Sequence, residues 1–289
     1  MRRIPIWAFS SMKGAARGRN TDDVRAMPEA GAFIVTDGKA GWEGVGGEDL
    51  LAAKLSTWCA SEPFVEEGAA AAQDDMLRAV ELAQARLLRL GVEEGGASLG
   101  AVRITEHWAE VIHVGDCRVY RCRKGRLLAL TEDHALAVGE AHISTQSMGR
   151  ADFKPGYALH HCLPGDVWLI CTASLAAGLS EAEIQAALST PIKDSLAAQR
   201  ICQSLAEQVV AAQPQADCTA CVVKIEPEGE GQGVVQPRGR TTYPPPPWLY
   251  APYSPLAEIP AAHRHPGAGA QRSEAQIKAL LAAVLGSDR

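Results

Sequence analysis

Four short strands that follow one another closely constrain the fold of this chain more than any other feature. The segments at 99–105, 108–114, 118–122 and 126–130 are rich in apolar and β-branched residues, which is typical of strands. The gaps between them are too short to hold a crossover helix, which parallel neighbours would need. The spacing therefore predicts that these strands pair antiparallel, as a meander.

The long helices are expected in two blocks that lie between groups of strands. Helical periodicity fits residues 47–59, 74–90, 180–188 and 195–211, and further strands are expected at 32–36, 167–172 and 219–225. Strands and helices that are grouped in this way are typical of the α+β class rather than of alternating βαβ units. We therefore expect antiparallel sheets that are covered by helices.

Composition and charge exclude several classes of partner. The 289 residues are 47% hydrophobic and 21% charged, which is typical of a globular protein. The net charge of −6 leaves no basic surface of the kind that binds nucleic acid, so we expect no nucleic-acid partner. Arg2 and Arg3 precede no signal-like apolar stretch, and no apolar run approaches the roughly 18 residues of a membrane span. We expect a cytoplasmic protein with no membrane partner.

The composition changes abruptly near residue 226. Residues 227–270 hold ten of the 17 prolines, which predicts an extended linker. Residues 271–289 begin with a capping box at Ser273 and continue with apolar residues at helical spacing, which predicts a short amphipathic helix. The expected organisation is a domain at 1–226, a Pro/Gly-rich linker at 227–270 and a C-terminal helix at 271–289. The helix either folds back on the domain or contacts a partner protein.

The eight cysteines predict core packing rather than disulfides or zinc, because no secretion signal accompanies them. Cys218 and Cys221 form a C-x-x-C pair inside a predicted strand. Positions three apart in a strand point to opposite faces. We therefore expect that the two thiols do not share a metal ion.

Several carboxylates stand at the ends of predicted strands. Asp37 follows an apolar run and precedes glycines, so its carboxylate and a nearby main-chain carbonyl could bind one hard cation. Asp22 lies in a turn-rich stretch beside Arg17, and Asp217 immediately precedes the last strand. Each of these residues alone is equally typical of an ordinary turn.

Together and in this order, the segments resemble the metal-dependent protein phosphatase family (PPM, protein phosphatase type 2C), particularly its bacterial branch. Residues 35–41 match the pattern Val-x-Asp-Gly-x-x-Gly, and residues 114–120 are similar to Val-Gly-Asp-Ser-Arg-x-Tyr. The complete set of similar segments is 17–22, 35–41, 96–98, 114–120, 130–134, 163–175 and 216–219.

The resemblance implies a β-sandwich of two antiparallel sheets that are flanked by helices, with Mn²⁺ or Mg²⁺ at one edge. It implies that Asp37 bridges the ions and is the central catalytic carboxylate, and that Gly38 offers its carbonyl. Asp22 would support the water shell, and Asp217 would hold the second ion. Arg17 would bind the phosphate, since its planar fork suits bidentate contact. Two bridged ions would turn a water into the attacking hydroxide.

The departures from the family pattern fall at the second ion. Ala173 stands where the family has a ligand aspartate, and Ser174, Thr21 and Cys218 replace a glycine, a glutamate and an asparagine. Losing a ligand weakens a metal site strongly, since even outer-shell losses cost about 10- to 100-fold. We therefore expect one ion rather than two. Glu48, Asp49 and Asp23 are candidates for a replacement carboxylate.

Two functions follow from these residues. The first is a protein serine/threonine phosphatase that hydrolyses a phosphoprotein substrate, weakly because of Ala173. The alternative is an inactive pseudophosphatase that binds a phosphoprotein or a kinase partner. The sequence leaves both open.

Overall fold

The structure is a computed structural model that describes residues 5–38, 48–65, 76–89, 96–105, 107–138 and 141–226. The predicted linker at 227–270 and the C-terminal helix at 271–289 lie outside the described residues, as does most of the glycine-rich segment after Gly38. The organisation predicted for the tail therefore stays a prediction.

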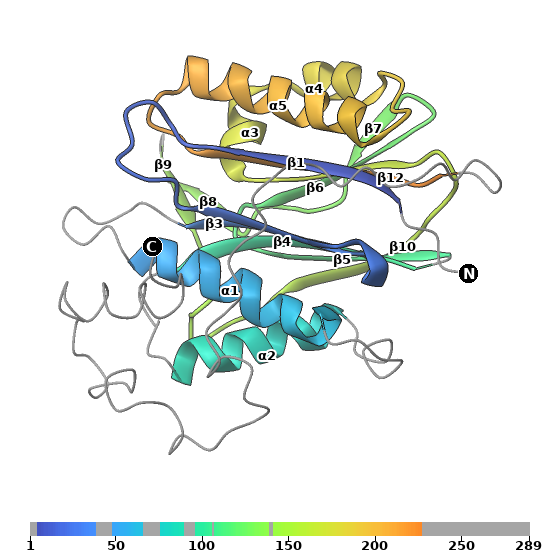
Figure 1. The fold of residues 1–289 in the computed structure, drawn as a ribbon. Coiled ribbons are helices and arrows are strands. Elements are labelled where there is room, and N and C mark those ends of the chain that lie inside the picture. The colour runs from blue at the N-terminus through green and yellow to red at the C-terminus, as the bar shows by residue number, and fades with distance from the viewer. Residues whose placement is uncertain are drawn as a thin grey trace, which may run out of the picture.

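The described chain folds into two five-stranded sheets that face each other (Figure 1). The first sheet has the order β1 (Ile6–Met12), β12 (Cys218–Lys224), β11 (Val167–Cys171), β6 (Arg118–Arg123) and β7 (Arg126–Ala129). The second sheet has the order β10 (Gly156–His161), β5 (Trp108–Val114), β4 (Ala97–Ile104), β3 (Ala32–Gly38) and β2 (Asp22–Met27). All neighbouring strands pair antiparallel, and β8 (Ala135–Val138) and β9 (Ala141–Ser144) form a separate hairpin.

Helices cover the outer face of each sheet. The first sheet is covered by α3 (Ala173–Gly178), α4 (Glu181–Leu188) and α5 (Ser195–Ala212), and the second by α1 (Glu48–Val65) and α2 (Met76–Arg89) (Figure 1). A 3₁₀ turn, Pro28–Ala30, links β2 to β3. The α+β sandwich flanked by helices is thus confirmed.

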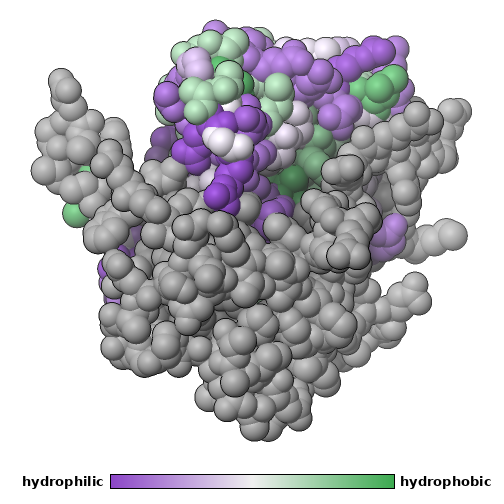
Figure 2. Space-filling model, turned by 60° about the vertical axis from the view of Figure 1, so that its left-hand side comes forward, coloured by the Kyte–Doolittle hydropathy of each residue, from purple (hydrophilic) through white to green (hydrophobic). Residues whose placement is uncertain are grey.

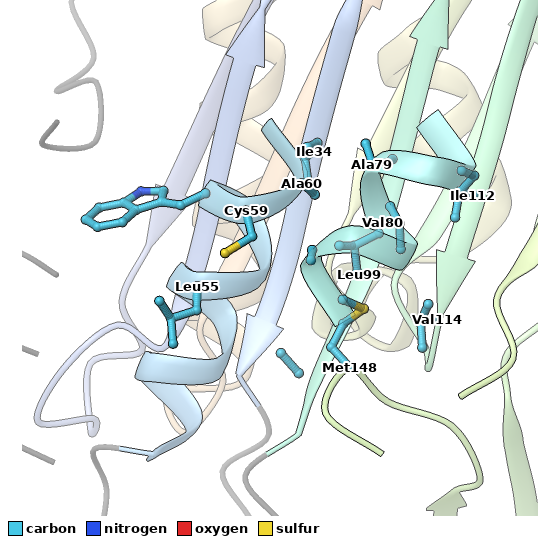
Figure 3. Packing of buried hydrophobic residues seen from close by; sticks show 14 of the residues in the cluster. Ile34, Leu55, Cys59, Ala60, Ala79, Val80, Leu99, Ile112, Val114 and Met148 are labelled. Carbon is cyan, nitrogen blue, oxygen red and sulfur yellow. The ribbon is translucent and has the colours of Figure 1, made fainter. Parts of the chain in front are cut away.

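Three hydrophobic clusters fill the layers between these elements. Trp168 and Phe33 belong to the cluster between the two sheets, and α5 packs on the first sheet through a second cluster. Figure 3 shows the third cluster, in which Leu55 and Cys59 of α1 and Val80 of α2 pack against the strands of the second sheet. The outer helical layer at the top of Figure 2 shows mainly hydrophilic side chains with small hydrophobic areas between them. Strands that are buried on both faces explain why their sequences are nearly continuous apolar runs.

The predicted meander is correct in its two hairpins and wrong at its centre. β4 pairs with β5, and β6 pairs with β7, but β5 and β6 belong to different sheets. Gly115, with a φ of +82°, sits in the turn between β5 and β6, a conformation that glycine adopts without strain. At this turn the chain leaves the second sheet and enters the first.

The cysteines behave as predicted. All eight are free and buried. Cys218 belongs to the cluster under the helices of the first sheet, whereas Cys221 belongs to the cluster between the sheets. The two thiols point to opposite faces of β12 and cannot share a metal ion. Among the described helices, none is long and apolar enough to cross a membrane.

Candidate metal centre

The predicted site residues meet at one edge of the sandwich, where the loop between β1 and β2 approaches the start of β12, at the left of Figure 1. Asp22, the first residue of β2, is the cross-strand partner of Asp37 on β3. Asp217 immediately precedes β12 and contacts the β1–β2 loop through hydrogen bonds. The fold therefore brings together carboxylates that are almost 200 residues apart in the sequence.

Asp22 is a buried carboxylate with one unused oxygen. Its residue exposure is 5%, and its Oδ1 accepts no hydrogen bond from an N–H or hydroxyl group of the described residues, although the carboxyl of Asp37 lies close enough for the two acids to share a proton. Its Oδ2 accepts a hydrogen bond of 2.8 Å from Thr219 Oγ1. Burial raises the pKa of Asp22 well above its ordinary value, and the neighbouring charges of Asp37 and Asp217 raise it further. A buried acid beside other acids is an environment that a cation would stabilise.

A chain of hydroxyl and amide groups orients Asp22. Because the Thr219 hydroxyl donates its one proton to Asp22, the Ser11 hydroxyl 2.7 Å away must donate to Thr219. Asn20 Nδ2 in turn donates to Ser11 Oγ at 2.9 Å, and Asn20 Oδ1 accepts from the Asp22 N–H at 3.0 Å. The network therefore runs from the β1–β2 loop across β1 and β12 to the Asp22 carboxylate.

Asp23 does not replace the absent carboxylate. Successive side chains of a strand point to opposite faces. Asp22 contacts Thr219 of the first sheet, whereas Asp23 pairs with Lys54 of α1 at 3.2 Å. Asp23 therefore lies on the helix side of the second sheet, away from the site. The side chains of Glu48 and Asp49 lie outside the described residues, as does Lys39.

Asp217 differs from Asp22 because both of its oxygens are engaged. Its Oδ1 accepts from the Gly14 N–H at 2.9 Å. Its Oδ2 accepts from the Thr21 N–H at 2.8 Å and from the Thr21 hydroxyl at 2.9 Å. Arg17 Nη2 lies 3.4 Å from the same oxygen and donates to Thr21 Oγ1 at 2.9 Å. We call this arrangement of Gly14, Arg17, Thr21 and Asp217 the Asp217 clamp.

The backbone holds the clamp in place. The N–H of Ala16 donates to the Pro214 carbonyl, and that of Arg17 donates to the Gly14 carbonyl, each at 2.9 Å. A Cβ atom at Gly14 would lie 2.6 Å from the Pro214 carbonyl oxygen, so only glycine permits this approach of the two loops. The main chain at Arg17 is thus held against the loop that precedes β12.

The segment that carries Ala173 forms hydrogen bonds with Asp217 and Thr219, at the start of β12. Ala173 is the first residue of α3, and Ser174 Oγ donates to the main-chain carbonyl of Asp217 at 2.6 Å. Thr172 Oγ1 accepts from the Thr219 N–H at 3.0 Å. These bonds fix α3 against the start of β12 without a carboxylate on the site side.

Solved structures resemble this arrangement of sheets over nearly their whole length. The PPM Ser-Thr phosphatase MsPP from Mycobacterium smegmatis, in complex with cacodylate, is 25% identical, with a TM-score of 0.62 over 76% of this chain and 97% of that one. PppA, a key regulatory component of T6SS in Pseudomonas aeruginosa, is 23% identical, with a TM-score of 0.62 over 77% and 98%. The catalytic domain of the serine threonine protein phosphatase PstP, in complex with two manganese ions, is 20% identical, with a TM-score of 0.64 over 77% and 99%.

This chain has the PPM phosphatase fold. The resemblance seen in the short sequence segments is confirmed by the structure as a whole. The sequence itself significantly matches no protein-family model and no curated protein.

In this PPM-fold chain, one of the two expected metal positions has donor groups that suit a divalent ion, and the other does not. Asp22, Asp37 and Gly38 lie together, and Asp22 offers a buried oxygen without a partner, so an oxygen-seeking ion fits there. Asp217 offers no comparable oxygen, and Ala173 offers none at all. Among the described residues, no three His, Cys, Asp or Glu side chains are arranged as a complete metal site. The assignment of metal ligands therefore stays a prediction.

Two other acidic residues near this edge have structural partners. The Ser98 hydroxyl donates to Asp116 beside the turn at Gly115. Asp133 accepts two hydrogen bonds from the Arg118 guanidinium, at 2.8 and 2.7 Å.

The contribution of Ser11 to the site was not predicted from the sequence. No local signal marks Ser11, because its role depends on the pairing of β1 with β12, which places it opposite Thr219.

Proposed function

We propose that this chain is a metal-dependent protein serine/threonine phosphatase that works with one divalent ion, Mn²⁺ or Mg²⁺, held by Asp22, Asp37 and the Gly38 carbonyl. The observation that carries the proposal is the buried Oδ1 of Asp22, which accepts no hydrogen bond from the described residues and lies beside Asp37. A buried polar atom without a partner is costly, and a bound cation removes that cost. The presence of two manganese ions in the PstP structure supports the choice of metal.

The residues of this chain would divide the work as follows. Thr219, Ser11 and Asn20 hold the Asp22 carboxylate in one orientation. Arg17 places a fixed positive charge at the same edge, where it can attract a phosphate. The ion, when bound, supplies Lewis acidity that activates water and polarises the phosphoryl oxygen.

The test is phosphate release from a phosphothreonine peptide, measured with and without millimolar Mn²⁺. We expect slow release that depends on Mn²⁺ and that falls by at least about 100-fold in Asp37→Asn, because the variant loses the central ligand. Asp152→Asn is the matched control, since Asp152 is an exposed residue paired with Arg150. Equal activity in Asp37→Asn and in the unmodified protein would show that this site does no chemistry.

The second candidate is a pseudophosphatase that binds a phosphoprotein or a kinase partner without turnover. The hydrogen bonds that both Asp217 oxygens accept from the protein favour it, because the two-ion arrangement that the family resemblance implies needs that carboxylate. A rise in melting temperature with Mn²⁺ but no phosphate release would support this candidate, since a ligand that binds only the folded state must stabilise it. Gain of activity in Ala173→Asp would then identify the missing ligand as the cause.

The proposal includes a phosphoprotein as the substrate of the phosphatase, and a phosphoprotein or a kinase as the partner of the pseudophosphatase. It also includes the C-terminal helix, which folds back on the domain or contacts a partner protein. The acidic net charge of −6 supports the absence of a nucleic-acid partner. The cytoplasmic location stays a prediction, and fractionation of the cells that produce the protein would test it.

A further inference from the structure

We infer that Arg17 and Thr21 take the place of a second divalent ion at Asp217, so that the site combines one metal ion with one fixed guanidinium. The inference rests on the proposed function for the ion at Asp22 and Asp37. The Asp217 clamp itself is a property of the described structure. The inference assigns Asp217 a structural and electrostatic role in place of the metal-ligand role that the family resemblance implies.

The first argument is the number of donors around the carboxylate. A carboxylate has about four positions at which it can accept hydrogen bonds. At Asp217, the N–H groups of Gly14 and Thr21 and the Thr21 hydroxyl fill three of them, and Arg17 Nη2 lies 3.4 Å from Oδ2. These groups point their positively polarised hydrogens at the oxygens. A cation at Oδ2 would have to displace the two Thr21 donors, and the Thr21 main chain is itself held by the bond from the Gly38 N–H to the Thr21 carbonyl.

The second argument is charge. The Asp217 side chain is only 3% exposed, so its negative charge needs a partner. The Arg17 guanidinium provides that partner from a side chain that is 22% exposed. Asp217 therefore already has a cationic partner, whereas Asp22 is buried near two other acids and contacts no cationic side chain among the residues that the structure describes.

The third argument is that two departures from the family pattern fit one another. A glutamate at position 21 could not donate a hydrogen bond to Asp217, but the Thr21 hydroxyl donates to Asp217 and accepts from Arg17 at once. Ala173 removes the carboxylate that would otherwise add negative charge at this position. Thr21 therefore builds part of the clamp, and Ala173 lowers the negative charge that an ion would otherwise balance.

The arrangement leaves part of Arg17 available for an anion. Among the described residues, its side-chain contacts involve only Nη2. A guanidinium carries five N–H donors in a planar fork, so the remaining edge can contact a phosphate while Nη2 stays on Asp217. One residue thus replaces an ion and keeps its phosphate-binding role.

The first test compares melting temperatures in EDTA, which removes metal ions. If Asp217 is held by the clamp, Asp217→Asn places an amide NH₂ against the Thr21 and Arg17 donors, and the melting temperature falls by roughly 5 °C or more. Asp37→Asn is the matched control on the neighbouring carboxylate, and it should lower the melting temperature less than Asp217→Asn does, because it also relieves the repulsion with Asp22. If Asp217 were instead an empty metal ligand, Asp217→Asn would behave like Asp37→Asn, and this result would overturn the inference.

The second test counts bound Mn²⁺ by equilibrium dialysis and by electron paramagnetic resonance. We expect one ion per chain with the spectrum of an isolated ion, and two ions per chain only in the double variant Thr21→Glu/Ala173→Asp. If Asp217→Asn fails to fold, Thr21→Val provides the same information: the inference requires its Mn²⁺ affinity to stay within about threefold. Two coupled ions in the unmodified protein would overturn the inference. Absence of any bound Mn²⁺ would overturn the proposed function alone, and the EDTA experiment would still decide whether the clamp exists.

Discussion

Replacing Thr219 by valine tests whether the hydroxyl network holds Asp22 as a carboxylate. Thr219 is fully buried on β12, and its hydroxyl donates to Asp22 Oδ2 at 2.8 Å. Valine has nearly the same shape, so the substitution removes the hydroxyl with little change in packing. Asp22 Oδ1 already has no hydrogen-bond partner, so the variant would leave both oxygens of a buried acid without that support.

The expected loss can be estimated from the kind of bond removed. A hydrogen bond to a charged group contributes about 1.5–3 kcal/mol, and a bond to a neutral group contributes about 0.5–1.5 kcal/mol. We expect Thr219→Val to lower the free energy of unfolding by about 2 kcal/mol in metal-free protein. For a domain of this size, that loss corresponds to a fall of about 4–8 °C in melting temperature.

Ser11→Ala separates the two halves of the network. It removes the donor to Thr219 but leaves the bond from Thr219 to Asp22, so we expect a loss of only about 1 kcal/mol. The double variant should lose less than the sum of the two single losses, since both changes act through one hydroxyl. The measurement is urea denaturation in EDTA, followed by Mn²⁺ titration, in which Thr219→Val should weaken binding about 10-fold. A stability loss below about 0.5 kcal/mol together with unchanged Mn²⁺ affinity would refute the reasoning.

Two further predictions concern the framework of the site. Gly14→Ala would place a Cβ 2.6 Å from the Pro214 carbonyl oxygen, so urea denaturation should show a loss of about 1–3 kcal/mol, whereas Gly18→Ala, which meets nothing within 4 Å, should lose almost nothing. Burial lowers the pKa of His113, whose Nε2 lies 2.7 Å from the Glu132 carbonyl oxygen. The unfolded chain therefore binds more protons than the folded one below pH about 6.5, and stability should fall as the pH drops through that value. His113→Gln should make this fall shallower in melting curves between pH 7.5 and 5.5, and an equally steep fall in the variant would contradict the assignment.

The parts of the fold that could be predicted are those in which a local pattern decides the structure. The limits of helices α4 and α5 were predicted to within a few residues, because their apolar residues are regularly spaced. Each helix also follows a capping residue, Ser180 for α4 and Asp194 for α5. β5 was predicted with its correct limits, since it is a mainly apolar segment, rich in β-branched residues, between turn residues. In each case the sequence near the element contains the information.

The parts that were missed depend on contacts between distant segments. β1 and β2 were not predicted, although β1 joins the first sheet through β12, more than 200 residues later. β2 begins with two aspartates, which disfavour strands, and it forms because β3 lies beside it. The separation of β5 and β6 into different sheets was missed for the same reason. A three-residue gap is compatible with a hairpin and with a change of sheet, and only the packing of both sheets decides between them.

Asp22 and Asp217 show the same limit at the site. The resemblance of short segments to the phosphatase motifs predicted both as metal ligands, and the structure places both at the same edge of the sandwich. What a carboxylate can bind depends on the donors that already surround it, and these come from Ser11 and Thr219 in one case and from Gly14, Arg17 and Thr21 in the other. The first set leaves Asp22 Oδ1 without a donor, whereas the second set gives each oxygen of Asp217 at least one donor. A match at the level of single residues therefore identifies where a cation is needed, whereas the surrounding donors decide whether that cation is a metal ion or an arginine.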